Sequence, residues 1–283
     1  MNQPLVSVIC VCHNHAAFVT EALDSVMTQT YPHIDLIIID DASTDGSAKI
    51  IKRWLAKYPQ ATLVLNSENL GYCKTFNRAF ALTQGEFIID LAADDILLPD
   101  RIATGVQALE QAGPEYGVTF SDALHMDAAG AILWKHSDQY PHESIPSGDI
   151  YRHLINRYFI CSPTMMFKRE VLISMKGYDE SLTYEDFDLW IRSARNFKYV
   201  YTPQVLVKKR KLKNSMSHAQ RIVLSKHGWS TLEVCRKIKL LNRTDDERRA
   251  LNQRIGYEIR QSLRAINLAL TFRYLILWWQ NRS

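Results

Sequence analysis

The sequence predicts an α/β fold in which a mostly parallel central sheet is flanked by helices and followed by a C-terminal helical extension. Strand-length apolar runs alternate with segments of helical periodicity, and short loops join them, as in βαβ units. Acidic residues follow two of the apolar runs directly, at Asp40-Asp41 and at Asp94-Asp95. Strand ends of this kind gather at one edge of an α/β sheet, where ligands usually bind.

The first elements follow in order along the chain. Val6–Cys12 is a buried strand, and the next apolar stripe, from Phe18 to Met27, marks a helix that ends before Pro32. Leu36–Ile39 is the second strand, and the residues after it can cap a helix. The caps are Ser43, Thr44 and Asp45, and the helix stripe is Ile50, Ile51, Trp54, Leu55 and Tyr58. The next expected elements are a strand at Ala61–Leu65, a helix at Thr75–Leu82, a strand at Glu86–Leu91 and a helix starting at Pro99.

The second half has a weaker pattern. Tyr116–Ser121 continues the sheet, Asp122–Asp149 reads as loops and short strands, and Pro163–Phe167 is a candidate strand. Phe187, Trp190, Ile191 and Ala194 share one helical face, and the chain beyond Ser217 is helical in character. We therefore expect a catalytic domain over residues 1–217 and a helical extension over residues 218–283.

Composition narrows the class of protein. A hydrophobic content of 47% with 23% charged residues is typical of a folded protein. The five cysteines are scattered and odd in number, which disfavours a disulfide framework or a zinc site and favours a reducing cytoplasm. The N-terminus lacks the pattern of a signal peptide, and no apolar run of about 18 residues predicts a spanning helix. From Ala219 onward, 13 Lys and Arg stand against 5 Asp and Glu, so a basic tail follows a mildly acidic body.

With these elements placed, the chain resembles the family 2 glycosyltransferases, which are inverting enzymes of the Rossmann-like GT-A fold that use nucleotide-sugars. The resemblance covers roughly residues 5 to 217 and rests on the order of several motifs. These are Val6-Ser7-Val8-Ile9 with Asn14, Ser25–Tyr31, Ile39–Ser47, Asn69-Leu70-Gly71 with Asn77, Gly85–Ile88, Asp94-Asp95 with Pro99-Asp100, Gly177–Glu180 and Glu185–Trp190.

The resemblance implies a donor site. Asp41 would hold the nucleotide base by hydrogen bonds, although Asp40 and Asp41 could instead serve the start of the following helix. His13 would stack on the base or touch the diphosphate, and Lys74 would reach the pyrophosphate, unless each is only a surface side chain. The remaining donor-site residues are Val11, Asn14, Asn69 and Asp94, with Asp94 facing the ribose or a metal-bound water.

The resemblance also implies a metal ion. Asp95 would coordinate Mg²⁺ or Mn²⁺, because a nucleoside diphosphate leaves readily only when a cation neutralises its charge. The family often has another acid two positions before Asp94, where this chain has Ala92. A single protein carboxylate then implies that most metal ligands come from substrate and water. The alternative is a pair of acids in a solvated turn before Pro99.

Asp186 is the candidate catalytic base. Inverting transfer needs one carboxylate to take the proton of the acceptor hydroxyl, and a place in the first turn of a helix keeps Asp186 ionised. Glu185 would position the acceptor. The alternative is that both acids only stabilise the start of the helix.

Two basic regions complete the prediction. Leu212 stands where many members of the family have a histidine that completes the metal or phosphate site. Either Lys213 or His218 takes its place, or the cluster Lys208–Lys211 neutralises the diphosphate in a flexible basic loop that closes over the donor. The tail, with Phe272–Trp279 after Arg260 and Arg264, resembles an interfacial anchor for a membrane surface. The alternative is that it packs on the catalytic domain or on a second copy of the chain.

The expected function is transfer of a sugar, from UDP by family frequency, to a hydroxyl of a glycan or lipid-linked oligosaccharide during surface polysaccharide synthesis. One scaffold serves many sugars in this family, so the resemblance does not select one. The alternatives are a nucleotidyltransferase, disfavoured because no glycine-rich loop follows the first strand, and a non-catalytic module of the same fold. The absence of G-x-G-x-x-G disfavours a dehydrogenase, and no motif for nucleic-acid recognition is present.

Overall fold

The computed structural model describes residues 3–140, 144–183, 185–212 and 226–282, and the side chains of Glu185, Lys226 and His227 are outside this description. Contacts divide the chain into two compact units. Unit 1 comprises residues 1–148, 160–178 and 197–211, and unit 2 comprises residues 149–159, 179–196 and 212–283. The boundary predicted at residues 217 and 218 lies outside the described residues.

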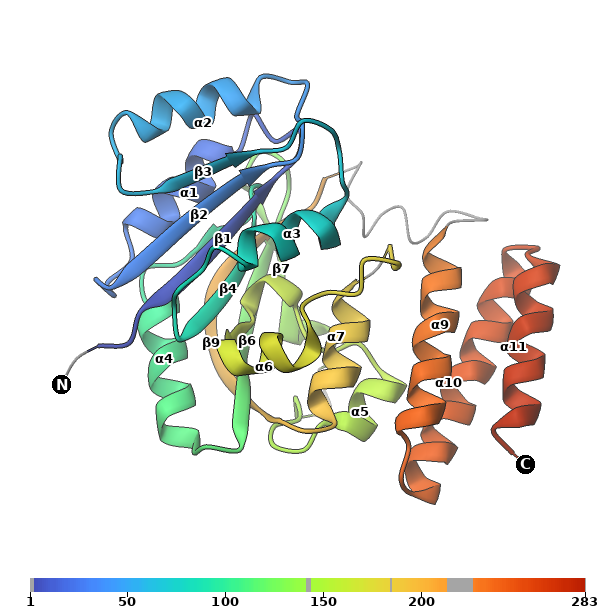
Figure 1. The fold of residues 1–283 in the computed structure, drawn as a ribbon. Coiled ribbons are helices and arrows are strands. Elements are labelled where there is room, and N and C mark those ends of the chain that lie inside the picture. The colour runs from blue at the N-terminus through green and yellow to red at the C-terminus, as the bar shows by residue number, and fades with distance from the viewer. Residues whose placement is uncertain (1–2, 141–143, 184, 213–225, 283) are drawn as a thin grey trace. The chain divides into compact units, whose positions relative to one another are not determined.

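Unit 1 is built on a sheet whose strands run in the order β3-β2-β1-β4-β8-β6-β9-β5, with β7 paired to β6 (Figure 1). The four strands β3, β2, β1 and β4 are parallel, which confirms the predicted βαβ half. The bounds are β1 Val6–Cys12, β2 Ile34–Asp40, β3 Thr62–Leu65, β4 Phe87–Ala92, β5 Ile96–Leu97, β6 Tyr116–Met126, β7 Ile132–Lys135, β8 Met166–Lys168 and β9 Lys198–Arg210.

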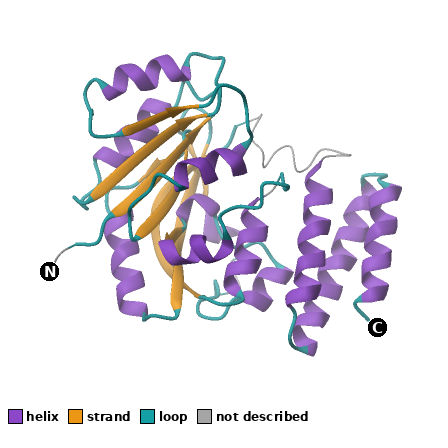
Figure 2. Ribbon diagram, in the orientation of Figure 1, coloured by secondary structure: helices purple, strands orange, loops and turns teal. Residues whose placement is uncertain are grey.

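Helices cover both faces of this sheet (Figure 2). A buried hydrophobic cluster joins alternate residues of β1, β2 and β4 to the apolar faces of α1, α2 and α4, as period-2 and period-3.6 patterns require. α3 packs on the opposite face, where Asp90 of β4 accepts a hydrogen bond from Tyr72 at 2.7 Å. The bounds are α1 Val19–Met27, α2 Ser47–Leu55, α3 Tyr72–Phe80, α4 Arg101–Ala112 and α6 Arg169–Met175, with 3-10 turns η1 His136–Gln139 and η2 Ser162–Thr164.

Several predicted boundaries need correction. α3 begins three residues before Thr75, because Gly71 with φ +82° turns the chain into the helix. α4 begins at Arg101, two residues after Pro99. The N-cap position of α2 is taken by Gly46, and Asp45 instead accepts hydrogen bonds from the backbone N–H and hydroxyl of Ser47.

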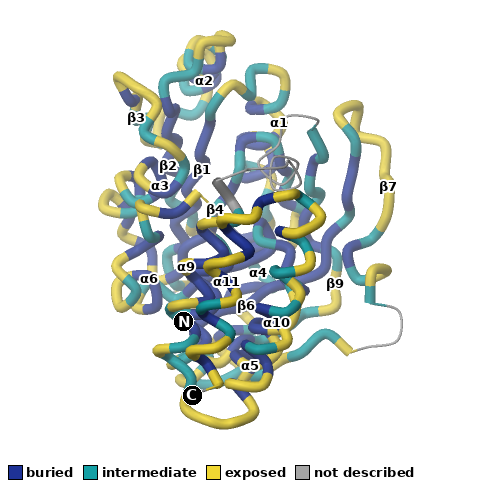
Figure 3. Tube along the Cα trace, turned by 90° about the vertical axis from the view of Figure 1, so that its right-hand side faces the viewer, coloured by how far each residue is buried: buried dark blue, intermediate teal, exposed yellow. Residues whose placement is uncertain are grey.

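Two strands differ from the sequence prediction, because β6 is longer than expected and β9 was not expected. β6 continues to Met126, into a region expected to be loops and short strands, because it pairs along its length with β9. The 13-residue β9 itself has polar residues on much of its length, and only its pairing with β6 and β5 makes it a strand. Every residue of β1 is buried, and most residues of β2, β4 and β6 are buried as well (Figure 3).

Unit 2 consists of helices. They are α5 Tyr151–Asn156, α7 Glu185–Ala194, α9 Lys226–Leu241, α10 Asp245–Arg264 and α11 Leu268–Gln280. Thr244 and Glu247 form a capping box at the start of α10. Arg254 of α10 is almost fully buried, with its guanidinium 4.2 Å from the ring centre of Tyr158 and 2.8 Å from Glu258. The predicted C-terminal helices are therefore confirmed for residues 226–282.

Candidate functional site

The carboxyl edge of the parallel strands in unit 1 brings together the loops that follow β1, β2, β3 and β4. Backbone hydrogen bonds continue the ladder past the strand ends, from Asp41 to Cys12 at 2.8 Å and from Asn66 to Asp40 at 2.9 Å. On the other side of β1, Ala93 donates to the carbonyl of Val11 at 3.0 Å. Val11 is buried, and its carbonyl is used within the sheet.

Asp41 organises the loop after β3. Its Oδ1 accepts hydrogen bonds from Asn66 at 2.7 Å and from the backbone N–H of Leu70 at 2.9 Å, and its Oδ2 accepts one from Gly71 at 3.0 Å. Burial opposes the ionised form, but these hydrogen bonds, together with one from Thr75, outweigh it and lower the pKa of Asp41 below 3.8. The carboxylate is therefore ionised, and the protein itself uses most of its hydrogen-bonding capacity.

The side chains of His13, Asn14 and Asn69 lie together beside the backbone carbonyl of Asp41. His13 Nδ1 lies 2.7 Å from the carbonyl oxygen of Asp41, so this nitrogen carries the proton. The other ring nitrogen then accepts from Asn14 at 3.1 Å and from Asn69 at 3.0 Å. Three of the predicted donor-site residues thus form one network with the backbone of Asp41, although they lie in two different loops.

Asn14 ties this network to the loop after β2. Its backbone adopts φ +59°, and its side-chain oxygen accepts a hydrogen bond from the backbone N–H of Thr44 at 2.8 Å. Asp40 accepts one from the backbone N–H of Ser43 at 2.9 Å, so Asp40 supports the turn that leads into the following helix. These bonds fix the carboxyl edge before any ligand is added.

The acidic pair lies at the end of β4. Asp95 is 3% exposed, and its Oδ1 accepts the backbone N–H of Arg210 at 2.8 Å. Burial and the charge of Asp94 raise the pKa of Asp95 to about 8, against the opposing effect of Lys209 and Arg210. His15 lies near Asp94, with 3.9 Å between Nδ1 of His15 and Oδ1 of Asp94.

This pair fits a hard divalent cation. Two carboxylates that repel one another at the edge of a sheet are stabilised when a cation binds them, and oxygen ligands are those that Mg²⁺ and Mn²⁺ prefer. Asp95 accepts its one described hydrogen bond on Oδ1, which leaves Oδ2 for a ligand. The charge of a nucleoside diphosphate could be neutralised there.

Arg210 has a structural role that the sequence analysis did not recognise. Its buried guanidinium donates to the carbonyls of Asp94, Asp127 and Ala128 at 3.0, 3.3 and 3.1 Å, and to Glu21 at 2.5 Å. These bonds hold the end of β9 against the loop that carries Asp94 and Asp95. A lone arginine in a basic run gives no sequence signal for such a role.

The expected flexible basic loop is wrong for Lys208–Arg210, because these residues belong to β9 and pair with β6 and β5. Lys213 and His218 lie outside the described residues. Lys74 is exposed on the first turn of α3. Asn77 exchanges two hydrogen bonds of 2.9 Å with the backbone of Tyr178, so it joins α3 to the turn that follows α6.

The predicted base lies in unit 2. Asp186 is half-buried in the first turn of α7, as expected, and Glu185 precedes it. Two residues further on, Asp188 is fully buried and binds Lys237 and Arg192 at 2.6 Å each. Lys237 also binds Asp179 at 2.5 Å, so α7 is anchored to α9 through these ion pairs.

Comparison with known proteins gives a consistent result. The family model described as "Glycosyl transferase family 2" matches residues 7–175. An uncharacterized glycosyltransferase of Methanocaldococcus jannaschii, MJ1057, is 29% identical over 239 residues, which cover 83% of this chain and 80% of that protein. A putative teichuronic acid biosynthesis glycosyltransferase of Bacillus subtilis, TuaG, is 22% identical over 242 residues, 86% of this chain and 92% of that protein.

Solved structures share the fold. A mannosyltransferase from Pyrobaculum calidifontis, solved with GDP-Man and Mn²⁺, aligns with a TM-score of 0.66 at 21% identity over 100% of this chain and 83% of its own. S. aureus TarS, solved with UDP-GlcNAc, aligns with a TM-score of 0.65 at 14% identity over 98% of this chain and 91% of its own. The predicted GT-A-like fold is confirmed by these similarities.

Proposed function

The chain belongs to glycosyl transferase family 2, and from that premise we propose that it moves a sugar from a UDP-sugar to a hydroxyl of a glycan or lipid-linked acceptor in the synthesis of a surface polysaccharide. The observation that supports this most is the carboxyl edge of unit 1. The buried carboxyl group of Asp95 lies there beside Asp94, at the edge where the loops carrying Asp41 and His13 interlock. UDP-GlcNAc in the TarS structure and the teichuronic acid relative support the donor and the pathway class.

In the proposed mechanism, the Asn69–Gly71 loop held by Asp41 binds the nucleoside, and His13, Asn14 and Lys74 surround the donor. Asp95 would hold Mg²⁺ or Mn²⁺, and Asp94 would face the ribose or a metal-bound water. The metal would supply the positive charge that makes the diphosphate a good leaving group. Asp186 takes the proton from the acceptor hydroxyl as its oxygen attacks the anomeric carbon, and Glu185 positions the acceptor. Transfer is then an in-line displacement with inversion.

A nucleotide panel tests the donor and metal together. We expect thermal stabilisation by UDP in the presence of Mn²⁺, a smaller effect of GDP and dTDP, and loss of the Mn²⁺ dependence in Asp95→Asn. Asp100→Asn, at another acidic position just beyond this loop, serves as the control. Stabilisation by UDP that is equal with and without metal would contradict the proposed metal role, and no response to any nucleotide would favour a non-catalytic module.

The base is tested by Asp186→Asn. We expect normal folding and a loss of turnover of at least about 100-fold, because removal of a general base typically costs about 10²–10⁴-fold. Asp246→Asn is a matched control, since Asp246 is also an acid in the first turn of a helix. Near-normal turnover of Asp186→Asn with the preferred donor would refute the assignment.

We also propose that α11 attaches the protein to a membrane surface. Leu268, Phe272, Leu275 and Trp279 repeat at helical spacing and are 66%, 63%, 45% and 70% exposed, and the C-terminal region carries an excess of basic residues. Among the described residues, no helix is long and apolar enough to cross a bilayer.

Flotation with anionic liposomes tests the attachment. Phe272→Ser with Trp279→Ser should lower recovery with the vesicles, whereas Ile173→Ser, at an exposed apolar residue of unit 1, should not. Equal flotation of all three proteins would exclude membrane attachment through α11. If the double variant instead changes the oligomeric state in sedimentation, the exposed apolar residues of α11 contact a second copy of the chain.

A further inference from the structure

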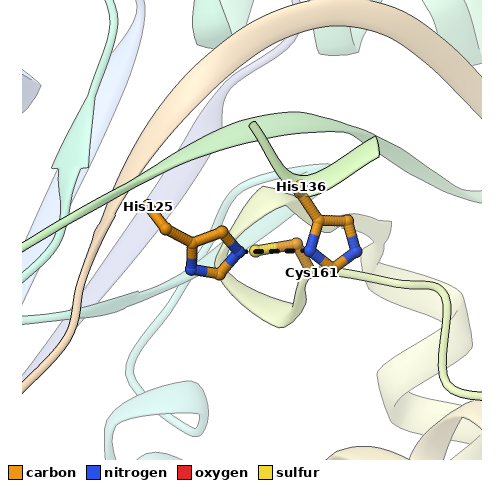
Figure 4. A group of neighbouring side chains, drawn as sticks. All are labelled: His125, His136 and Cys161. Carbon is orange, nitrogen blue, oxygen red and sulfur yellow. Dashed lines mark hydrogen bonds between the residues drawn. The ribbon is translucent and has the colours of Figure 1, made fainter. Parts of the chain in front are cut away.

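Unit 1 contains a second group of metal-ligating side chains, chemically different from the acidic pair. His125 lies near the end of β6, His136 begins η1 directly after β7, and Cys161 precedes η2. Their ligand atoms all lie within 4.8 Å of one another, and the three residues are 4%, 8% and 3% exposed. Figure 4 shows the two imidazole rings facing each other, with the thiol of Cys161 directed at the space between them.

The distances suit a tetrahedral ion. His125 Nε2 and His136 Nδ1 are 3.2 Å apart. Two nitrogen ligands at Zn–N distances of about 2.0–2.1 Å and tetrahedral angles lie about 3.3 Å apart, and a nitrogen and a sulfur lie about 3.6 Å apart. The nitrogens therefore already have the separation of zinc ligands, and the distance from the sulfur to each nitrogen exceeds that of a zinc site by at most about 1.2 Å.

The protonation state of the histidines also suits a metal. His125 is buried, and burial favours its neutral ring, which is the form that binds metals. His125 Nδ1 is buried and has no hydrogen-bond partner among the described residues. Without an ion, one proton must be shared between the two facing nitrogens, whereas an ion uses both of their lone pairs.

From this geometry we propose that His125, His136 and Cys161 form a site for Zn²⁺. Two imidazoles and a thiolate favour zinc over Mg²⁺ and Mn²⁺, which prefer oxygen ligands. The site would therefore not compete with the acidic pair for the same ion. The scattered cysteines made a zinc site unexpected from the sequence, because only one of them contributes and the two histidines come from a separate segment.

The ion would cross-link two segments of unit 1 beside the candidate active site. It would join the segment β6–β7–η1 to the turn before β8, two regions that are far apart in the sequence. In the β6–β9 pairing, His125 lies opposite Lys209 and Met126 lies opposite Arg210. The backbone N–H of Arg210 donates a hydrogen bond to Asp95. The zinc ligand His125 is therefore paired with the residue that directly precedes Arg210 in β9.

Metal titration of the chelator-treated full chain, without nucleotide, tests the proposal. We expect one Zn²⁺ per chain, and with Co²⁺ an absorption band from thiolate-to-cobalt charge transfer. Cys161→Ser should lose this band and weaken binding at least tenfold. Cys73→Ser should behave as the wild type, because Cys73 is another buried cysteine of unit 1 that forms no disulfide and lies outside the cluster.

A second measurement covers the case in which Cys161→Ser does not fold. Alkylation of the wild-type chain, followed by peptide mapping, should show that Zn²⁺ protects Cys161 while Mn²⁺ does not. A wild-type chain without the cobalt band, a Cys161→Ser chain that folds and binds like the wild type, or equal alkylation of Cys161 with and without Zn²⁺ would each overturn the proposal. All of these readouts are independent of glycosyl transfer.

Discussion

Substitution of Asp41 by asparagine should destabilise the protein much more than the same change at its neighbour Asp40. Asp41 accepts hydrogen bonds on both oxygens, from Asn66 and the backbone of Leu70 on one and from Gly71 on the other. An asparagine amide must direct its NH₂ group at one of these donors, since it has only one acceptor oxygen.

The magnitude follows from these contacts. Loss of one hydrogen bond to a charged group costs about 1.5–3 kcal/mol, and a buried N–H that faces another donor costs about 1–3 kcal/mol more. We therefore expect the free energy of unfolding to fall by about 3 kcal/mol in Asp41→Asn. In Asp40→Asn, the oxygen keeps its bond from Ser43, and the replaced oxygen is one without a hydrogen-bond partner among the described residues. That variant should lose less than about 1 kcal/mol.

Urea unfolding monitored by circular dichroism measures both variants, and pH supplies a further check. Because folding lowers the pKa of Asp41 below 3.8, its contribution is fully present above that pH and is lost as the pH falls through the folded-state pKa. The difference between wild type and Asp41→Asn should accordingly narrow below about pH 4. Equal stability of the two variants at pH 7 would refute the structural role of Asp41.

Three further predictions concern other parts of the chain. Arg210→Lys should lower the free energy of unfolding by about 2–4 kcal/mol, because one ammonium group cannot bind the carbonyls of Asp94, Asp127 and Ala128 and the carboxylate of Glu21 together. A loss below about 0.5 kcal/mol in urea unfolding would contradict this. Gly177→Ala should lower the free energy of unfolding by about 2 kcal/mol, because Gly177 has φ +72° and a Cβ there would lie 2.2 Å from Asn77 Oδ1. The double variant Gly177→Ala/Asn77→Ala should lose less free energy of unfolding than the sum of the two single variants. Strict additivity in thermal unfolding would rule out the clash. Asp179→Asn should lower the free energy of unfolding by about 1–2 kcal/mol at pH 7, because hydrogen bonds from Lys237 and Ser181 outweigh burial and lower the pKa of Asp179 to about 2. If the same loss of stability persists at pH 2, the ion pair is not its source.

Local patterns were sufficient to predict the parallel half of the sheet. β1 and β2 are continuous apolar runs, and α1 and α2 carry apolar stripes that match the face of the sheet they cover. For such elements the burial partner can be inferred from period alone. The C-terminal helices were predictable for the same reason, although α10 owes its start to the capping box of Thr244 and Glu247.

Pairing between distant segments was not predictable. β9 is polar over much of its length and is a strand because β6 supplies its hydrogen bonds, so Lys208–Arg210 were expected in a loop. The structural role of Asn66 also depends on contacts that no motif records, since it donates to Asp41 and accepts from Arg78 at 2.7 Å.

The sequence by itself determined the fold class, the family and the positions of the acids that follow strands, because these depend on local periodicity and on the order of motifs. Only the tertiary structure decided that Asp41 supports the Asn69–Gly71 loop, that Arg210 braces the acidic pair, and that His125, His136 and Cys161 meet. Each of these depends on the burial of a polar group, which must find its partner wherever the folded chain places one.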